Sequence, residues 1–131
     1  MTSRIRAINA YMPDIQLGDL AGLDDLVELI ARSTGLNEGT IHQVLTELRD
    51  AVFFYARRGQ PVQLEGLGIY TPYISLEGEI TVGHRADTWL KNQLNGKDAF
   101  KGAILRSENI GKTGDELVML WNTDHPEDPV A

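Results

Sequence analysis

The stretch that decides the fold reads Val62-Gln63-Leu64-Glu65-Gly66-Leu67-Gly68-Ile69-Tyr70. Apolar residues at 62 and 64 alternate with polar residues at 63 and 65, which is the period-two pattern of a half-buried strand. Two glycines then flank Leu67, and glycines inside a strand pattern indicate a bulge or a close backbone approach. We therefore predict an extended segment with a glycine-dependent irregularity, continuing to Leu76.

Two helices are predicted before this segment. The first begins at Leu23, repeats its apolar residues at helical spacing and ends at Thr34-Gly35, because glycine accepts the left-handed conformation that closes a helix. Asn37 is a favourable N-cap for the second. Its apolar stripe begins at Ile41, and Gly59 is the expected stop. The order is thus a helical hairpin followed by a glycine-punctuated strand.

The flanking elements are less regular. Residues 1–22 are expected to be an extended or irregular lead-in, and the tail from Asp124 to be loosely ordered. The remaining expected elements are a Glu77-Gly78 hairpin turn into a strand at 80–82, a short helix at 87–94, a strand at 100–105, and a last helix capped at Thr113.

This order of elements from Leu23 to Tyr70 resembles the HU/IHF family of bacterial histone-like nucleoid proteins. The matching parts are the first helix, the turn Thr34-Gly35-Leu36-Asn37, the Arg57-Arg58-Gly59 helix end and the strand at 62–70. The resemblance implies an α+β fold: an N-terminal helical hairpin, an antiparallel sheet with a short arm, a C-terminal helix, and an intertwined homodimer. The expected ranges are an extension at 1–22, an HU-like DNA-binding domain at 23–122 and an acidic tail at 123–131.

The chain departs from compact members of that family in its arm. The family's arm carries a basic run and an Asn-Pro-x-Thr-Gly tip whose proline wedges between base pairs, and nothing here matches that tip. Residues 73–85 are expected to form a shortened arm or hairpin. The chain is therefore similar to the divergent, longer members with an altered arm.

The charge balance is the main evidence against DNA, because duplex DNA attracts proteins through phosphate neutralisation. The net charge is −7. Residues 77–112 nevertheless carry six basic and five acidic side chains, whereas residues 113–131 carry five acidic and no basic ones. A locally positive surface is compatible with a negative total. The candidate DNA-binding residues are His84, Arg85, Lys91, Lys97, Lys101, Arg106 and Lys112.

His84 and Arg85, directly after the hairpin strand, are the favoured pair of phosphate contacts. The alternative for each basic residue is a solvated surface charge, and Arg57 and Arg58 are better explained by their place at a helix C-terminus. Phe53, Phe54 and Leu67 are the expected dimer core, with an ordinary monomer core as the alternative. The aromatic residues Tyr70, Tyr73 and Trp89 are expected in a core more than on bases.

Catalytic and metal sites are not expected. The chain has no cysteine, and its three histidines lack ligand-type spacing. We predict no enzyme activity, no cofactor, no small-molecule substrate and no membrane segment, hence a soluble cytoplasmic protein. The resemblance implies that this is the cytoplasm of a bacterium, on the nucleoid.

The predicted function is non-specific or shape-dependent binding of duplex DNA by an architectural homodimer. Two alternatives stay open: an HU-like fold reused as a protein-interaction or scaffolding module without DNA binding, and a single module of a larger assembly.

Overall fold

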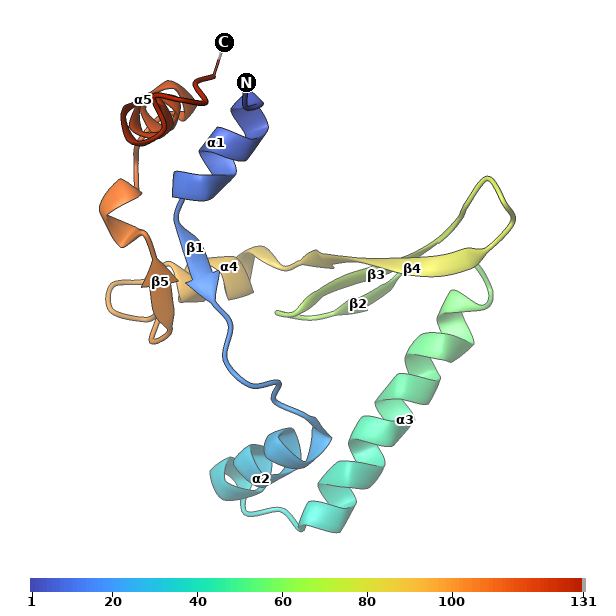
Figure 1. Cartoon of the computed structure of the whole chain (residues 1–131). Helices are drawn as coiled ribbons and strands as arrows, with labels where there is room; N and C mark the ends of the chain where they lie inside the picture. Colours follow the sequence, from blue (N-terminus) through green and yellow to red (C-terminus); the bar gives the residue numbers. More distant parts are fainter. Residues whose placement is uncertain (131) are drawn as a thin grey trace. The chain divides into compact units, whose positions relative to one another are not determined.

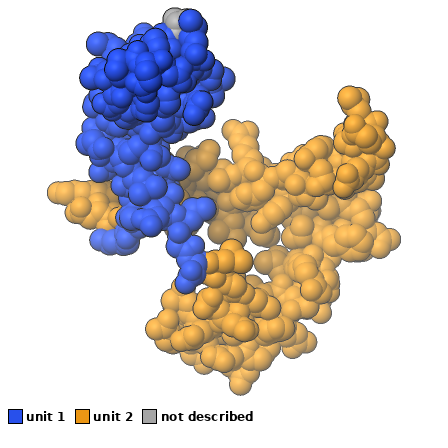
Figure 2. Space-filling model, viewed as in Figure 1, with its two compact units in different colours: residues 1–19, 101–131 blue, residues 20–100 orange. Residues whose placement is uncertain are grey.

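The computed structural model describes residues 1–130, which form an α+β structure with two antiparallel sheets. The chain divides into two compact units (Figure 2). The central unit is Leu20–Phe100, and the terminal unit combines Met1–Asp19 with residues from Lys101 onward. These units differ from the expected ranges, because residues 101–122 belong with the N-terminal segment and not with the helical hairpin.

Both predicted helices of the central unit are confirmed (Figure 1). Helix α2 spans Leu23–Thr34, and Gly35 closes it in the left-handed region with φ of 75°. Helix α3 spans Glu38–Ala56, and the Asn37 side chain caps it by accepting hydrogen bonds from the backbone N–H groups of Gly39 and Thr40. Local capping chemistry therefore sets both helix boundaries.

The segment at 62–70 is two strands and not one, which corrects the prediction. Strand β2, Val62–Leu64, ends in a tight turn in which the Leu67 N–H donates to the Leu64 carbonyl over 2.9 Å. Strand β3, Gly68–Ile74, then runs back antiparallel to it. Gly66 supplies the positive φ of 79° that the turn requires. The alternating pattern correctly predicts extended backbone, but it does not show that the chain reverses its direction within three residues.

The third strand of this sheet is β4, Ile80–Ala86, which pairs along the full length of β3. The Glu77-Gly78 turn joins them as predicted, with Gly78 at φ 89°. The short helix α4, Thr88–Leu94, follows and is capped by the Asp87 carboxylate, which accepts from the Trp89 N–H. The strand order is β2-β3-β4.

The two faces of this sheet differ in exposure along β2 and β3, but not along β4, where Val82 and His84 are exposed as well. Paired residues of antiparallel strands point to the same side, and alternate residues point to opposite sides. Along β2 and β3, the even-numbered residues from Val62 to Pro72 are buried or half-buried, whereas the odd-numbered ones from Gln63 to Tyr73 are exposed. We call these the inner face (Val62, Leu64, Tyr70, Pro72, Val82, His84) and the outer face (Gln63, Ile69, Thr71, Tyr73, Thr81, Arg85).

The terminal unit contains structure where an irregular lead-in was expected. Helix α1, Arg4–Tyr11, and strand β1, Asp14–Gln16, occupy that region. Helix α1 packs against α5, Gly114–Asp124, burying Ala7, Leu117 and Trp121. The Ser3 side chain caps α1, but the packing that stabilises so short a helix comes from residues more than a hundred positions away.

The other terminal elements are shorter than predicted or differently placed. Strand β5 covers only Ala103–Leu105 and pairs antiparallel with β1. A 3-10 turn, η1, follows at Ser107–Asn109. The Thr113 cap of α5 is confirmed, because its hydroxyl accepts from the Glu116 N–H. However, α5 packs on α1 and belongs to the terminal unit.

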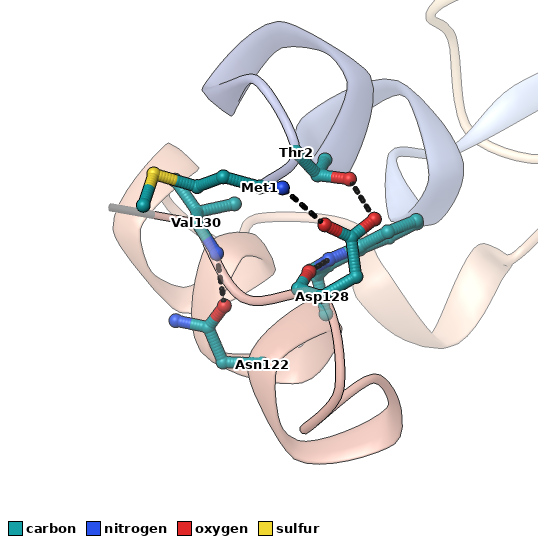
Figure 3. A network of polar contacts seen from close by, with 6 residues as sticks. Met1, Thr2, Asn122, Asp128 and Val130 are labelled. Atoms are coloured by element: carbon teal, nitrogen blue, oxygen red, sulfur yellow. Dashed lines mark hydrogen bonds and ion pairs between the residues drawn. The ribbon is translucent and has the colours of Figure 1, made fainter.

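The acidic tail is held in place, which corrects the expectation of a loose end (Figure 3). The Asp128 carboxylate accepts a hydrogen bond from the Thr2 hydroxyl and pairs with the N-terminal ammonium over 3.0 Å. These contacts lower the pKa of Asp128, the Thr2 hydrogen bond having the largest effect. The Trp121 indole donates to the Asp128 carbonyl, and Asn122 accepts from the Val130 N–H. The two ends of the described chain are therefore tied together.

Candidate nucleic-acid interface

His84 and Arg85 are neighbours in sequence but lie on opposite faces of the sheet. Both side chains are exposed, but Arg85 pairs with Ile69 on the outer face, whereas His84 pairs with Tyr70 on the inner face. The ring centroids of Tyr70 and His84 are 4.6 Å apart. The structure therefore separates the favoured pair, and only Arg85 stands on the outer face.

Arg85 is the only charged residue among those of the outer face. It continues the cross-strand row formed by Gln63 and Ile69. The rest of this face offers hydroxyl groups, an amide and a tyrosine ring, all of which can contact phosphate, sugar or base edges. Its chemistry thus suits contact with a duplex, with a single cation per chain.

Two further candidates belong to the central unit. Lys91 lies in α4, and Lys97 lies in the turns that follow it. Both side chains are exposed. They are therefore available to phosphates, although neither is part of the outer face.

The other three candidates, Lys101, Arg106 and Lys112, belong to the terminal unit. Arg106 donates through Nε to the Met12 carbonyl, and Lys112 donates through Nζ to Asn109 Oδ1. These internal bonds give both residues a structural role. Lys101 is exposed.

Asn109 is a structural residue that sequence reasoning missed. Its amide donates to the Tyr11 carbonyl over 2.7 Å, and Arg106 donates to the adjacent Met12 carbonyl. Two carbonyls at the end of α1, which lack helical partners, are thereby satisfied. No local pattern marks Asn109, because its partner lies 98 positions away.

Charge does not distinguish the two units. The central unit carries seven basic and eleven acidic side chains, and the terminal unit carries five and eight. Both are therefore net negative, and any attraction for phosphate is local to particular side chains. The sequence between Gly59 and His84 contains no basic residue, so the strands of the hairpin contribute Arg85 as their only full cation.

Arg57 and Arg58 follow directly after α3, and their guanidinium groups lie over aromatic rings of that helix. The Arg57 guanidinium lies 5.8 Å from the centre of the Phe53 ring, and that of Arg58 lies 5.5 Å from the centre of the Phe54 ring. Such contacts are favourable cation–π interactions.

The three residues expected in a dimer core are exposed in the single chain. Phe53 is 64%, Phe54 49% and Leu67 48% exposed. Phe53 also lines an open apolar groove of about 640 Å³ between the end of α3 and the hairpin residues Pro72 and Val82. In the central unit only Val27 and Ile41 are buried apolar side chains. A single copy of this unit thus leaves much of its apolar surface uncovered.

Two of the aromatic residues expected in a core are on the surface. Tyr73 and Trp89 are each 56% exposed, whereas Tyr70 is half-buried. Tyr73 belongs to the outer face and also lines the groove beside the end of α3. The prediction holds for Tyr70 and is wrong for the other two in the isolated chain.

The class of protein follows from the central unit. A helical hairpin, a three-stranded antiparallel sheet entered through a glycine turn, and a short closing helix together define an HU-like domain. The family model described as "HU domain fused to wHTH, Ig, or Glycine-rich motif" matches residues 6–98, so the chain belongs to this HU-like family. A search of curated proteins gave no match. Within residues 1–130, none of the helices combines the length and apolar character needed to cross a membrane.

Proposed function

We propose that this protein is an architectural DNA-binding protein that acts as a homodimer in the bacterial cytoplasm, on the nucleoid. The observation that carries the proposal is the match to an HU-like family over residues 6–98. The role is one of binding, with duplex DNA as partner and without a catalytic step or cofactor.

The outer face supports this function. Arg85 projects from a surface that is otherwise uncharged and rich in hydrogen-bonding groups. Phosphate contacts of this kind position a protein without reading sequence, so we expect recognition to be non-specific or governed by DNA shape.

The exposed apolar surface supports the homodimer. The aromatic cluster at the end of α3 and the adjoining groove need a covering surface, and exposed apolar patches of this kind mark interfaces. A second copy of the chain supplies the cover that the resemblance implies.

The test is a titration of a fluorescently labelled duplex with the protein at several salt concentrations, followed by anisotropy. Binding through phosphates weakens linearly in log salt. Such a response supports the proposal, whereas no binding at low salt contradicts it.

A second candidate function is protein interaction without DNA binding. The observation that favours it is the negative charge of both units. In that case the same titration gives no salt-dependent binding, while the dimer persists.

A further inference from the structure

The tip of the β3–β4 hairpin differs in chemistry from its base. The turn carries Leu76, Glu77 and Glu79, and the Ser75 N–H donates to the Glu79 carbonyl over 2.9 Å, which extends the pairing beyond the strands. Leu76 is fully exposed. Within residues 1–130, neither glutamate side chain takes part in an ion pair or hydrogen bond. Both carboxylates are therefore free negative charges.

The position of Glu79 relative to Arg85 matters for a bound duplex. Glu79 immediately precedes β4, and its hydrogen bond with Ser75 continues the strand pairing. Because side chains alternate along an extended strand, residues 79 and 85 lie on the same side of the hairpin. They are six positions apart, which corresponds to roughly 20 Å at about 3.4 Å per residue. That distance exceeds the Debye length of about 10 Å at 0.1 M salt. Arg85 therefore does not offset the negative charge of the tip.

Phosphates close to the tip meet the two free carboxylates of the turn. Duplex DNA carries one charge per about 1.7 Å of its axis. If the whole hairpin lay along a duplex, phosphates would therefore come close to Glu77 and Glu79. Arg57 approaches the distal hairpin, because it lines the groove together with Tyr73, Ile74, Ile80 and Thr81. Its guanidinium lies over Phe53 at the end of α3, so this cation is not part of the turn that carries the glutamates.

We propose that Glu77 and Glu79 keep the hairpin tip off the duplex, so that DNA contact is confined to the outer face around Arg85 and covers a short, unbent stretch. This inference rests on the proposed DNA binding and adds which part of the hairpin contacts the duplex. The two glutamates act as residues that select against wrapping of DNA.

Leu76 provides the competing account. An exposed leucine at a hairpin tip has the chemistry of a wedge that enters the minor groove and kinks the duplex. Insertion of Leu76 would, however, carry the adjacent Glu77 carboxylate between the phosphates of the groove. We therefore assign Leu76 no contact with DNA, and its substitution separates the two accounts.

The experiment measures affinity and salt dependence on labelled duplexes of about one to three helical turns, roughly 10 to 30 base pairs. Affinities are expressed per binding position, and end-to-end fluorescence energy transfer reports bending. The proteins compared are the wild type, Leu76→Ala, the double variant Glu77→Lys/Glu79→Lys, and a control with the same charge change on helices, Glu28→Lys/Glu47→Lys. Glu28 and Glu47 are exposed and lie in α2 and α3.

We expect the wild type to gain no affinity per position beyond about one and a half turns and to leave energy transfer unchanged, and Leu76→Ala to behave like the wild type. The tip double variant should bind long duplexes several-fold more tightly than the helix control, and its log–log salt slope should be steeper by about 0.9 for each new lysine that contacts a phosphate, with two such lysines per chain.

The inference is overturned if Leu76→Ala loses bending or affinity, or if the tip and helix variants behave alike. A wild type that binds and bends long duplexes removes the inference but keeps the proposed function. A wild type that binds no duplex at low salt removes both.

Discussion

Gly68 lies directly against the backbone of Arg85 in the neighbouring strand. A Cβ atom at Gly68 would clash with the Arg85 carbonyl oxygen and lie 2.5 Å from His84 Nε2, and the residue has a φ of 154°. The absence of a side chain at Gly68 thus lets β3 lie close to the backbone of β4 at Arg85. This contact confirms the glycine-dependent close approach that the strand pattern at 62–70 predicts.

Gly68→Ala should therefore lower the free energy of unfolding by about 2 kcal/mol or more, because it combines backbone strain with a clash against an immovable carbonyl. Urea denaturation measures the change. Gly83→Ala in the same hairpin is the matched control, since its Cβ would make an ordinary 3.6 Å contact with Tyr73. Equal effects of the two substitutions would contradict the close-approach account.

Asn109→Ala should destabilise the terminal unit by about 1–3 kcal/mol, because it leaves the Tyr11 carbonyl without its donor in a site where Asn109 is only 4% exposed. Asn95→Ala is the control, as this exposed asparagine makes a similar bond to the Lys91 carbonyl. We expect that control to cost less than about 0.5 kcal/mol. If both variants unfold at the same denaturant concentration, the hydrogen bond from Asn109 to the end of α1 does not stabilise the terminal unit.

The terminal unit should lose stability in acid through Asp128. Its folded pKa is lowered, chiefly by the Thr2 hydroxyl, so its contribution is present above the unfolded value near pH 4 and is lost as the pH falls through the folded pKa. Trp121 reports this unit when Trp89 is replaced by Phe. In that background Asp128→Asn should lower the melting temperature near neutral pH, and the difference should shrink as the pH falls below about 4. A difference that is independent of pH would contradict the assignment.

The aromatic cluster at the end of α3 should control association. We expect the wild type to sediment as a dimer, and Phe53→Ser/Phe54→Ser to raise the dissociation constant at least tenfold, about 1.4 kcal/mol, because both rings are exposed in the single chain. Leu76→Ser, at the fully exposed hairpin tip, should leave the dimer intact. A wild type that sediments as a folded monomer at micromolar concentration contradicts this prediction.

The parts of the fold that local chemistry decides could be predicted from the sequence. The Asn37 cap, the Gly35 end and the Glu77-Gly78 turn each depend on residues within a few positions, and each is confirmed. Helix α1 was missed because its stability comes from packing against α5. Asn109 was missed for the same reason, since its partner is remote in sequence.

The candidate interface shows a different kind of error. His84 and Arg85 were paired because they are adjacent, yet adjacency in a strand places side chains on opposite faces. The alternation rule that identified the strand at Val62 was sufficient to separate them. The distribution of the other basic residues between two units depends on tertiary contacts that no local pattern contains.

The most direct test of the central claim, that the outer face binds DNA through Arg85, compares the salt dependence of duplex binding in the wild type, Arg85→Ala and His84→Ala. We predict that log affinity falls linearly with log salt in the wild type. The slope should be smaller by about 0.9 for each Arg85 removed, one per chain, and unchanged in His84→Ala, because His84 lies on the inner face. Equal slopes in the wild type and Arg85→Ala, or no salt-dependent binding at all, would contradict the account.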